Sequence, residues 1–192
     1  MSQSPFPTGP IEPHRAGLPR WALPALPRQP LRLVLDHVRS AHNVGALFRT
    51  ADAVAVDRVI LLGYTPHPPN PQLEKTALGA TAYVPWEHRD SAVGLLEELE
   101  GEGYQLVALE TGPDAAEIWD FTWPEKTALV VGNEVEGVSP EILGACRQKI
   151  SLPMLGYKAS LNVTTALGVA MYEFLRARRG KGAALGDEKT RS

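Results

Sequence analysis

Short apolar runs alternate with segments of helical spacing along the chain from about Leu31 onward. The runs are nearly continuous, which is typical of strands buried on both faces, and the segments between them place apolar residues three or four positions apart. This alternation predicts an α/β domain with a mainly parallel sheet flanked by helices. The expected strands are residues 32–36, 58–62, 83–86, 104–109, 127–131 and 149–152, and the expected helices are 43–55, 91–100, a short one opened by Ser139-Pro140 with serine as N-cap, and 161–178.

The last expected helix carries one apolar stripe. Residues that repeat at helical spacing on one face are typical of packing against a core, so we interpret them as core rather than as a ligand site. Three arginines occupy its last turn, where cations suit the helix dipole, and Gly180 can end the helix. The stripe consists of Val163, Leu167, Ala170, Met171, Phe174 and Leu175.

The two ends of the chain differ in composition from the part between them. Residues 1–30 hold eight of the seventeen prolines and have no periodicity, so we expect a flexible, proline-rich arm. We expect residues 31–180 to form one domain and residues 181–192 to form a disordered basic tail. A second proline cluster, from Pro66 to Pro71, predicts a loop, because so many prolines disfavour a helix or an inner strand.

Composition places the chain among soluble globular proteins. Its 192 residues are 44% hydrophobic and 21% charged, enough for one buried core. No apolar run approaches the roughly 18 residues of a membrane span, and the first residues lack the apolar stretch of a secretory signal. The single cysteine, Cys146, excludes an intramolecular disulfide and fits a reducing cytoplasm. The five histidines show no metal-ligand spacing, so we expect no bound metal.

Charge is distributed unevenly around a net value of −3. Residues 1–50 hold six arginines against two acidic residues, and residues 176–192 hold six basic against two acidic residues. The segment between them, 51–175, holds 7 basic and 18 acidic residues. Basic ends around an acidic body could form a phosphate-binding footprint for a nucleic acid. Exposed tails are also often charged for solubility alone, so the distribution leaves RNA binding open.

Three segments carry candidate chemistry, and the first is residues 43–52. Asn43 is placed as a helix N-cap, and the small residues Gly45 and Ala46 share the helical face of Arg49. Small neighbours leave room for a bulky group to approach the guanidinium, whose planar fork of donors suits phosphate or carboxylate. On this segment alone, an exposed Arg49–Asp52 ion pair is the simpler interpretation.

The second and third segments each follow an expected strand. In residues 130–137 an apolar strand ends in two glycines, which permit close approach to backbone donors, and two carboxylates, Glu134 and Glu136. On this segment alone, an ordinary strand-to-helix turn capped by Ser139 is the simpler interpretation. In residues 152–165 a loop enters the last helix with Ser160 as the expected N-cap. Asn162 lies beyond that cap and is not needed for it, which favours a site.

Together these segments resemble the three signature motifs of the SpoU/TrmH branch of the SPOUT methyltransferases. The matching pieces are N-x-G-x-x-x-R-T at residues 43–50, G-N-E-x-x-G at residues 132–137 and S-L-N-V-T at residues 160–164. Residues 75–80 also look like the segment that the family carries between its first two motifs. The resemblance extends over about residues 31–178, and three collinear motifs are far more specific than one.

The resemblance implies a homodimeric RNA 2′-O-methyltransferase that uses S-adenosylmethionine and whose C-terminal part forms a deep trefoil knot. It implies a catalytic role for Arg49, supported by Asn43, Glu134, Ser160 and Asn162. It also implies RNA contacts for Arg49 and Lys75, the latter with a phosphate. The residues that it implies around the cofactor are Gly132, Glu134, Gly137, Leu152, Met154, Leu161 and Asn162.

The position of Arg49 follows from the motif more firmly than its role does. In the family this arginine is often proposed as the general base that removes the proton of the ribose hydroxyl. An arginine with a pKa above ~12 is normally a fixed cation. It could instead clamp the RNA phosphate and stabilise the developing alkoxide.

Three other interpretations compete with this one. A protein that keeps the knot and binds cofactor and RNA without methyl transfer would not need Arg49. A dinucleotide enzyme would need G-x-G-x-x-G after the first strand, where the chain has none. A base-methylating SPOUT enzyme is disfavoured by the first motif. The sequence leaves tRNA and rRNA open as substrates, and it shows no separate RNA-binding domain before the expected methyltransferase domain.

Overall fold

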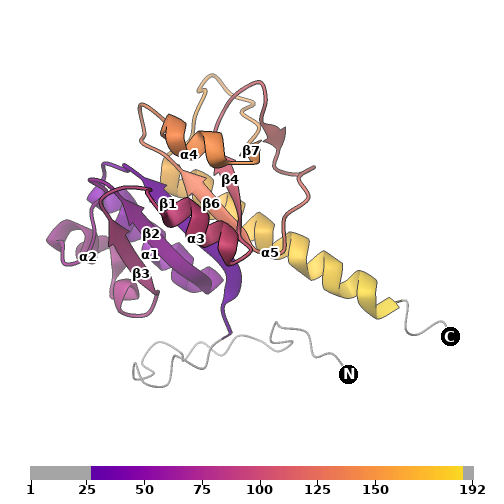
Figure 1. Cartoon of the computed structure of the whole chain (residues 1–192), viewed down its shortest axis with the longest axis horizontal. Helices are drawn as coiled ribbons and strands as arrows, with labels where there is room; N and C mark the ends of the chain where they lie inside the picture. Colours follow the sequence, from indigo (N-terminus) through magenta and orange to yellow (C-terminus); the bar gives the residue numbers. More distant parts are fainter. Residues whose placement is uncertain (1–26, 188–192) are drawn as a thin grey trace.

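A computed structural model describes residues 27–187 of the chain. Seven strands form one sheet in the order β3-β2-β1-β6-β4-β7-β5, and every neighbouring pair is parallel (Figure 1). The predicted parallel α/β architecture is therefore confirmed. The strands are β1 (Gln29–Asp36), β2 (Val56–Leu62), β3 (Trp86–Arg89), β4 (Gln105–Leu109), β5 (Ala116–Glu117), β6 (Thr127–Val131) and β7 (Gln148–Ser151).

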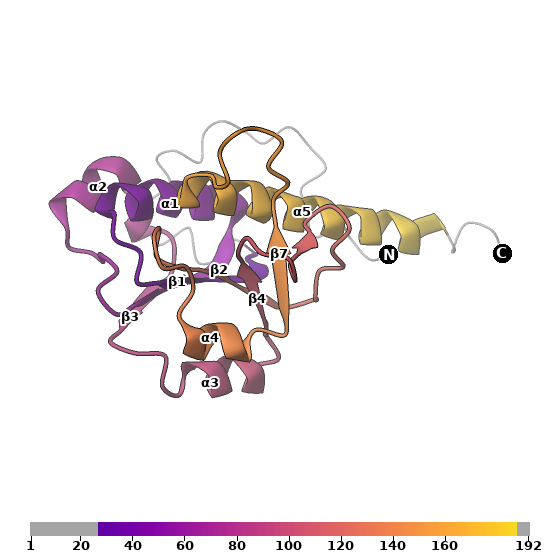
Figure 2. The same ribbon diagram turned by 90° about the horizontal axis from the view of Figure 1, so that it is seen from above.

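Helices cover both faces of this sheet. Figure 2 shows α1, α2 and α5 on one face and α3 and α4 on the other, with the distal half of α5 projecting beyond the sheet. Both faces of the central strands are therefore apolar, as parallel sheets require. The helices are α1 (Ala41–Val54), α2 (Pro71–Ala77), α3 (Leu95–Gly101), α4 (Pro140–Ala145) and α5 (Val163–Asp187), with a 3-10 turn η3 at Ala80–Ala82.

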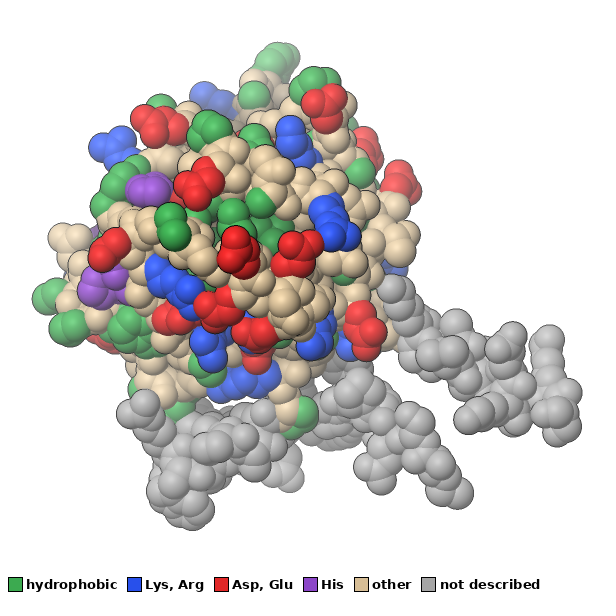
Figure 3. Space-filling view, viewed as in Figure 1, with side chains coloured by type: hydrophobic (Ala, Val, Ile, Leu, Met, Phe, Trp, Pro, Cys, Tyr) green, Lys and Arg blue, Asp and Glu red, His purple; other side chains and the backbone are tan. Residues whose placement is uncertain are grey.

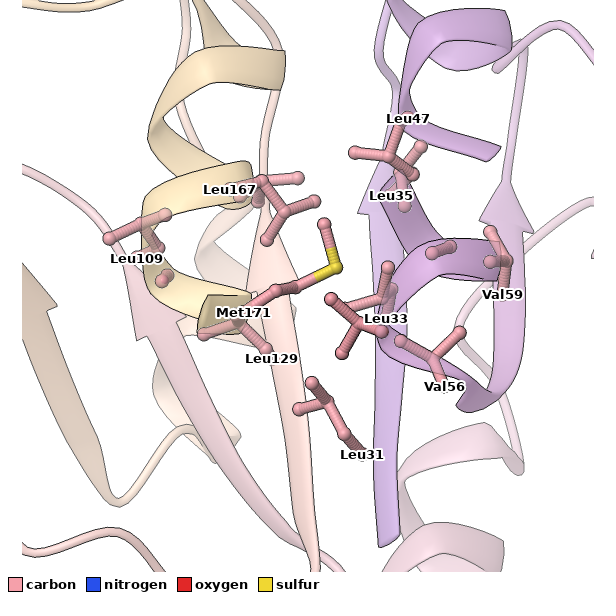
Figure 4. Packing of buried hydrophobic residues seen from close by; sticks show 14 of the residues in the cluster. Leu31, Leu33, Leu35, Leu47, Val56, Val59, Leu109, Leu129, Leu167 and Met171 are labelled. Carbon is pink, nitrogen blue, oxygen red and sulfur yellow. The ribbon is translucent and has the colours of Figure 1, made fainter. Parts of the chain in front are cut away.

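The larger core lies between the sheet and the α1–α5 layer. Alternate residues of β1 point into it, and Met171 of α5 reaches toward Leu33 and Leu35 (Figure 4). The predicted apolar stripe of the last helix is confirmed as core. Leu167, Ala170, Met171 and Phe174 are fully buried, and Val163 and Leu175 pack beside them.

Two helix starts differ from the sequence prediction. Ser40, not Asn43, is the N-cap of α1, and its side chain accepts a hydrogen bond from the Asn43 backbone N–H. Similarly, α5 begins at Val163, and the side chain of Asn162, not Ser160, accepts from the backbone N–H of Thr164 at 2.9 Å. In both segments several polar residues suit a cap, and the tertiary contacts select among them.

Other boundaries also shift. Residues 66–70 form the expected loop, but Pro71 opens α2, since proline is tolerated in the first turn of a helix. The strand expected at 83–86 begins only at Trp86, and α3 begins at Leu95 rather than near Ser91. The two-residue strand β5 and the 3-10 turn η3 are too short to show a hydrophobic period, and neither was predicted. Helix α5 continues through Gly180 to Asp187, because a glycine within a helix weakens it without ending it.

Gly45 serves helix packing rather than ligand access. A Cβ at this position would overlap Thr76 Oγ1 and the backbone carbonyl of Leu73, both on α2. The prediction that Gly45 leaves room for a group approaching Arg49 is therefore wrong. The small residue instead lets α1 and α2 come together.

Several expectations concern parts of the chain that the structure does not address. Residues 1–26, most of the expected arm, and residues 188–192, the end of the expected tail, lie outside the described residues. Within the described part, no helix has the length and apolar character needed to span a membrane.

The burial of Leu167 predicts a large contribution to stability. Leu167→Ala should lower the free energy of unfolding by about 2–5 kcal/mol, because it removes buried methyl groups and leaves a cavity. The matched change Leu155→Ala, at a side chain that is 98% exposed, should alter it by less than about 0.5 kcal/mol. Urea denaturation of the two variants measures the difference. Equal losses would contradict the assignment of Leu167 to the core.

Candidate active site

A cavity of about 320 Å³ lies at the carboxyl ends of β4, β6 and β7, where they meet the start of α5. The carboxyl edge of a parallel sheet is the usual place for a ligand site, because loops from several strands converge there. Its wall combines apolar side chains with polar groups from four separate segments. These are Leu109, Glu110 and Thr111; Val131, Gly132, Asn133, Glu134 and Gly137; Ser151, Leu152 and Met154; and Ser160, Leu161, Asn162, Val163 and Ala166.

The loop after β6 is closed on itself. Asn133 and Gly137 exchange two backbone hydrogen bonds of 2.9 Å, and a Cβ at Gly132 would overlap the backbone of Gly137. Gly137 has a φ of +74°, a conformation that side chains other than glycine rarely adopt. Both glycines of the second motif are thus required by backbone geometry.

The Asn133 side chain holds this loop against the rest of the domain. Its Oδ1 accepts from the backbone N–H groups of Val135 and Glu136, at 2.8 and 3.0 Å. Its Nδ2 donates to the His37 carbonyl at 3.0 Å and to the Tyr64 hydroxyl at 2.7 Å. The loop is therefore fixed before any ligand arrives.

Asn43 connects the three motifs. Its Nδ2 donates to Glu134 Oε1 at 3.1 Å, and its Oδ1 accepts from Asn162 Nδ2 at 3.2 Å. Its backbone carbonyl accepts from the hydroxyl of Thr164 at 3.2 Å. Because Ser40 caps the helix, the Asn43 side chain is free to bond to both Glu134 and Asn162. One amide thus joins α1 to the loop after β6 and to the start of α5.

Glu134 is held in its ionised form. Partial burial opposes ionisation, but hydrogen bonds from the Arg39 backbone N–H and from Asn43 outweigh it, and the pKa of Glu134 lies below its ordinary value. The Arg39 N–H donates to Oε2 at 3.0 Å while Asn43 donates to Oε1. Glu134 therefore contributes a fixed negative charge at the wall of the cavity.

The structure brings most of the expected site residues to one place. All seven residues expected around a cofactor line the cavity, and Ser160 lies on the same wall. Asn43 is absent from that lining and reaches it through Glu134 and Asn162. Ser160 and Leu161 are exposed at the rim.

Arg49 and Lys75 lie elsewhere on the surface. Both side chains are exposed, Arg49 on α1 and Lys75 in the last turn of α2, and neither lines the cavity of its own chain. Within residues 27–187, Arg49 makes no ion pair with Asp52. Burial raises the pKa of Asp52, and the charge that opposes this shift belongs to Arg28. The simpler interpretation of the first motif, an Arg49–Asp52 pair, is therefore wrong.

Sequence reasoning missed the contribution of β4. Leu109, Glu110 and Thr111 line the cavity but belong to none of the three motifs. Their position at the carboxyl end of an expected strand beside β6 was the available signal, since the ends of adjacent parallel strands share one edge.

The cavity suits an organic cofactor with an apolar part and a polar part. Its volume lies in the range of small-molecule sites, and its wall carries apolar side chains such as Leu152 and Leu161 together with polar groups such as Glu110 and Asn162. In the described part of the chain, no group of three or more His, Cys, Asp and Glu side chains is placed to hold a metal ion. The prediction that the protein binds no metal stays a prediction.

A helix-flanked parallel sheet with a preformed cavity at its carboxyl edge defines a small-molecule-binding α/β protein. The three sequence motifs that meet at this cavity identify the family of protein. The chain belongs to the SpoU rRNA methylase family, whose model matches residues 30–172.

Named relatives and solved structures agree with this assignment. A tRNA (guanosine(18)-2′-O)-methyltransferase of Aquifex aeolicus is 37% identical over 148 residues, which cover 77% of this chain and 69% of that protein. An Escherichia coli protein of the same name is 31% identical, covering 82% and 69%.

Among solved structures, the A. aeolicus TrmH/SpoU tRNA modifying enzyme superposes with a TM-score of 0.73 at 36% identity, covering 81% of this chain and 79% of that one. The SpoU methyltransferase AviRb of Streptomyces viridochromogenes, in complex with AdoMet, superposes with a TM-score of 0.74 at 25% identity, covering 83% and 64%.

Replacing Asn43 should change the ionisation of Glu134. Because the folded-state pKa of Glu134 is depressed, its ionised form stabilises the fold above the ordinary glutamate value of 4.5, and this contribution is lost as the pH falls through the lower, folded-state pKa. Asn43→Ala removes one donor and should raise that pKa, which carbon-detected NMR titration of the carboxylate measures.

The matched change Asn70→Ala removes the side chain that caps α2. Asn70 makes no hydrogen bond to Glu134 in the described structure, so the pKa of Glu134 should stay unchanged. An unaltered Glu134 pKa in Asn43→Ala would show that the two side chains do not interact in solution.

Proposed function

We propose that this protein is an S-adenosylmethionine-dependent RNA 2′-O-methyltransferase. The observation that carries the proposal is the joining of three signature motifs by Asn43 at one cavity. All seven residues expected to surround the cofactor lie on the wall of that cavity. A relative of the same family has been solved with AdoMet, and others are named as 2′-O-methyltransferases.

The reaction forms a bond between a ribose 2′-oxygen and a methyl carbon, breaks the carbon–sulfur bond of the donor and releases the hydroxyl proton. When bound, S-adenosylmethionine supplies a methyl group that its sulfonium already makes electrophilic. The protein must therefore mainly hold two reactants in line, and alignment alone can contribute about 7–11 kcal/mol. The closed loop 132–137 and the Asn43 contacts supply rigid positions for this task.

Arg49 acts on the RNA rather than on the cofactor in this proposal. Its exposed guanidinium does not line the cavity, so it is available to an RNA phosphate that approaches from outside. A guanidinium binds phosphate through two parallel hydrogen bonds and stabilises an alkoxide as its charge develops. Since arginine keeps its proton in proteins, we assign it the role of clamp and charge stabiliser, with the proton passing to an RNA phosphate oxygen or to water.

The alternative is a protein that binds cofactor and RNA without transferring methyl groups. Such a protein would need the cavity and could use Arg49 to bind an RNA phosphate, but it would have no alkoxide for the guanidinium to stabilise. The names of the relatives at 37% and 31% identity favour a catalyst. The same relatives make tRNA the first substrate to test, with rRNA as the second.

RNA should approach the side of the molecule that carries α1 and α2. On the opposite layer, α3 and α4 carry Glu97, Glu98 and Glu141 in their first turns, and Figure 3 shows Asp and Glu side chains interspersed with Lys and Arg. That face therefore presents a polyanion with charges of both signs rather than with a continuous basic patch. Arg49 and Lys75 are exposed on the α1–α2 side and can contact phosphates.

We also propose that the protein acts as a homodimer through the outer face of α5. Val169 and Tyr172 are 37% and 55% exposed on this helix, and Trp119 beside them is 50% exposed. Neighbouring apolar side chains at a surface are typical of an interface. A second copy also offers a role for Arg49, which can then contact RNA held beside the cavity of the partner chain.

The deep trefoil knot belongs to this proposal as well. Its support is the chain's membership of the SpoU family, since the knot is what the resemblance of the motifs implies. The reducing cytoplasm inferred from the single cysteine stays a prediction.

Arg49→Ala should reduce methyl transfer to tRNA by at least roughly a hundredfold, the scale of losing one charge-stabilising group. Its affinity for S-adenosylhomocysteine, measured by isothermal titration calorimetry, should stay within about twofold of the wild type, because Arg49 does not line the cavity. Arg49→Lys keeps the charge without the planar fork of donors, so its rate of methyl transfer should lie between those of the wild type and Arg49→Ala. Undiminished transfer by Arg49→Ala would refute the assignment.

Two exposed valines, Val169 and Val93, provide a matched test of the oligomeric state. Wild-type protein should scatter light as twice the 20.8 kDa of one chain. Val169→Asp should give the single-chain mass and little methyl transfer, because it places a charge within the proposed interface. Val93→Asp, at a site 78% exposed on the α3 side, should keep the double mass and the activity. A dimeric Val169→Asp would place the interface elsewhere.

A further inference from the structure

Glu110 is the charged residue in the cavity that the three motifs do not explain. It directly follows β4, is half-buried and lines the same cavity as Asn162. No Lys or Arg within the described residues forms an ion pair with it. A carboxylate in a ligand cavity without a cationic partner suits a ligand that donates hydrogen bonds.

Two backbone groups fix the Glu110 carboxylate in place. Oε2 accepts from the Val138 N–H at 3.1 Å, and Oε1 accepts from the Thr111 N–H at 3.2 Å. Gly137 packs directly against it, since a Cβ there would lie 2.7 Å from Oε2. An ionised carboxylate has about four acceptor positions, so each oxygen keeps one for a ligand. The side chain is thus positioned by β4 and by the loop after β6 together.

A methyl donor offers three groups that donate hydrogen bonds: the vicinal hydroxyls of its ribose, the 6-amino group of its adenine and the ammonium of its methionine part. The 6-amino group lies between two ring nitrogens that act as acceptors, and a carboxylate would repel them. The ammonium is accompanied by a carboxylate on the same carbon, which Glu110 would repel. The ribose carries two adjacent hydroxyls and no charge, and it matches two fixed oxygens. Acidic side chains at the carboxyl edge of parallel sheets bind ribose hydroxyls in the same way in dinucleotide sites.

We infer that Glu110 binds the 2′- and 3′-hydroxyls of the ribose of the methyl donor. The inference rests on the proposed function for the identity of the ligand. Glu110 then binds the nucleoside part of the cofactor, whereas Asn43, Glu134 and Asn162 join the three motifs to one another. This contact also gives Gly137 a second role, because any side chain at that position would displace the carboxylate.

The test uses three ligands and two variants of the full chain. The ligands are S-adenosylhomocysteine, 5′-methylthioadenosine, which keeps the ribose but lacks the amino-acid part, and the 2′,3′-dideoxy form of 5′-methylthioadenosine. Glu110→Gln replaces the carboxylate at nearly constant size, and Glu141→Gln is the matched control on the exposed first turn of α4. Calorimetry gives the dissociation constants, and thermal unfolding shows that each variant is folded.

Glu110→Gln should weaken S-adenosylhomocysteine and 5′-methylthioadenosine by the same factor, roughly tenfold or more, as expected for a hydrogen bond to a charged group. In the wild type, removing both hydroxyls should cost a similar factor, and in Glu110→Gln it should cost much less. Glu141→Gln should bind all three ligands as the wild type does. The comparison of the two nucleosides in the wild type holds even if Glu110→Gln fails to fold.

Three results would overturn the inference. Glu110→Gln could bind 5′-methylthioadenosine as tightly as the wild type, or it could weaken S-adenosylhomocysteine alone, which would place Glu110 at the amino-acid end. The wild type could also bind the dideoxy form as tightly as its parent. A wild-type protein that binds none of the three ligands would instead refute the proposed function itself.

Discussion

The site depends on one side-chain amide, that of Asn43. It donates to Glu134, 91 residues away in the sequence, and accepts from Asn162, 119 residues away. An amide is suited to this position because it offers a donor and an acceptor at once, whereas a carboxylate or an ammonium offers only one kind. The contacts bring the first turn of α1, the loop after β6 and the start of α5 to one edge of the cavity.

The rest of the site divides into a part built before binding and a part open to the solvent. The cavity wall is held by backbone bonds between Asn133 and Gly137 and by the bonds that Asn133 makes to His37 and Tyr64. Arg49 and Lys75, the cations expected to meet RNA, lie outside it on exposed surfaces. This separation fits a reaction in which a small cofactor is held closely and a large, mobile polyanion is brought to it from one side.

The sequence was sufficient for the architecture because buried parallel strands are nearly continuous apolar runs, as in β6, and because Leu167 to Phe174 repeat at helical spacing. It failed where several residues suit the same local role. Ser40 and Asn43, and likewise Ser160 and Asn162, are all residue types that suit a cap. In the structure Ser40 and Asn162 make the capping bonds, while the Asn43 side chain bonds to the distant residues Glu134 and Asn162. Gly45 and Glu110 were misread or missed, because their roles come from α2 and from the loop after β6, which no local pattern encodes.

The central claim is that Asn43 and Asn162 act as one unit in shaping the cofactor cavity. A double-mutant cycle on the affinity for S-adenosylhomocysteine tests it most directly, with Asn43→Ala, Asn162→Ala and the double variant measured under one condition. If the two amides act through their shared contact, the double variant should lose clearly less affinity than the sum of the two single losses. Losses that add in full would show that the residues act independently, and would contradict the account.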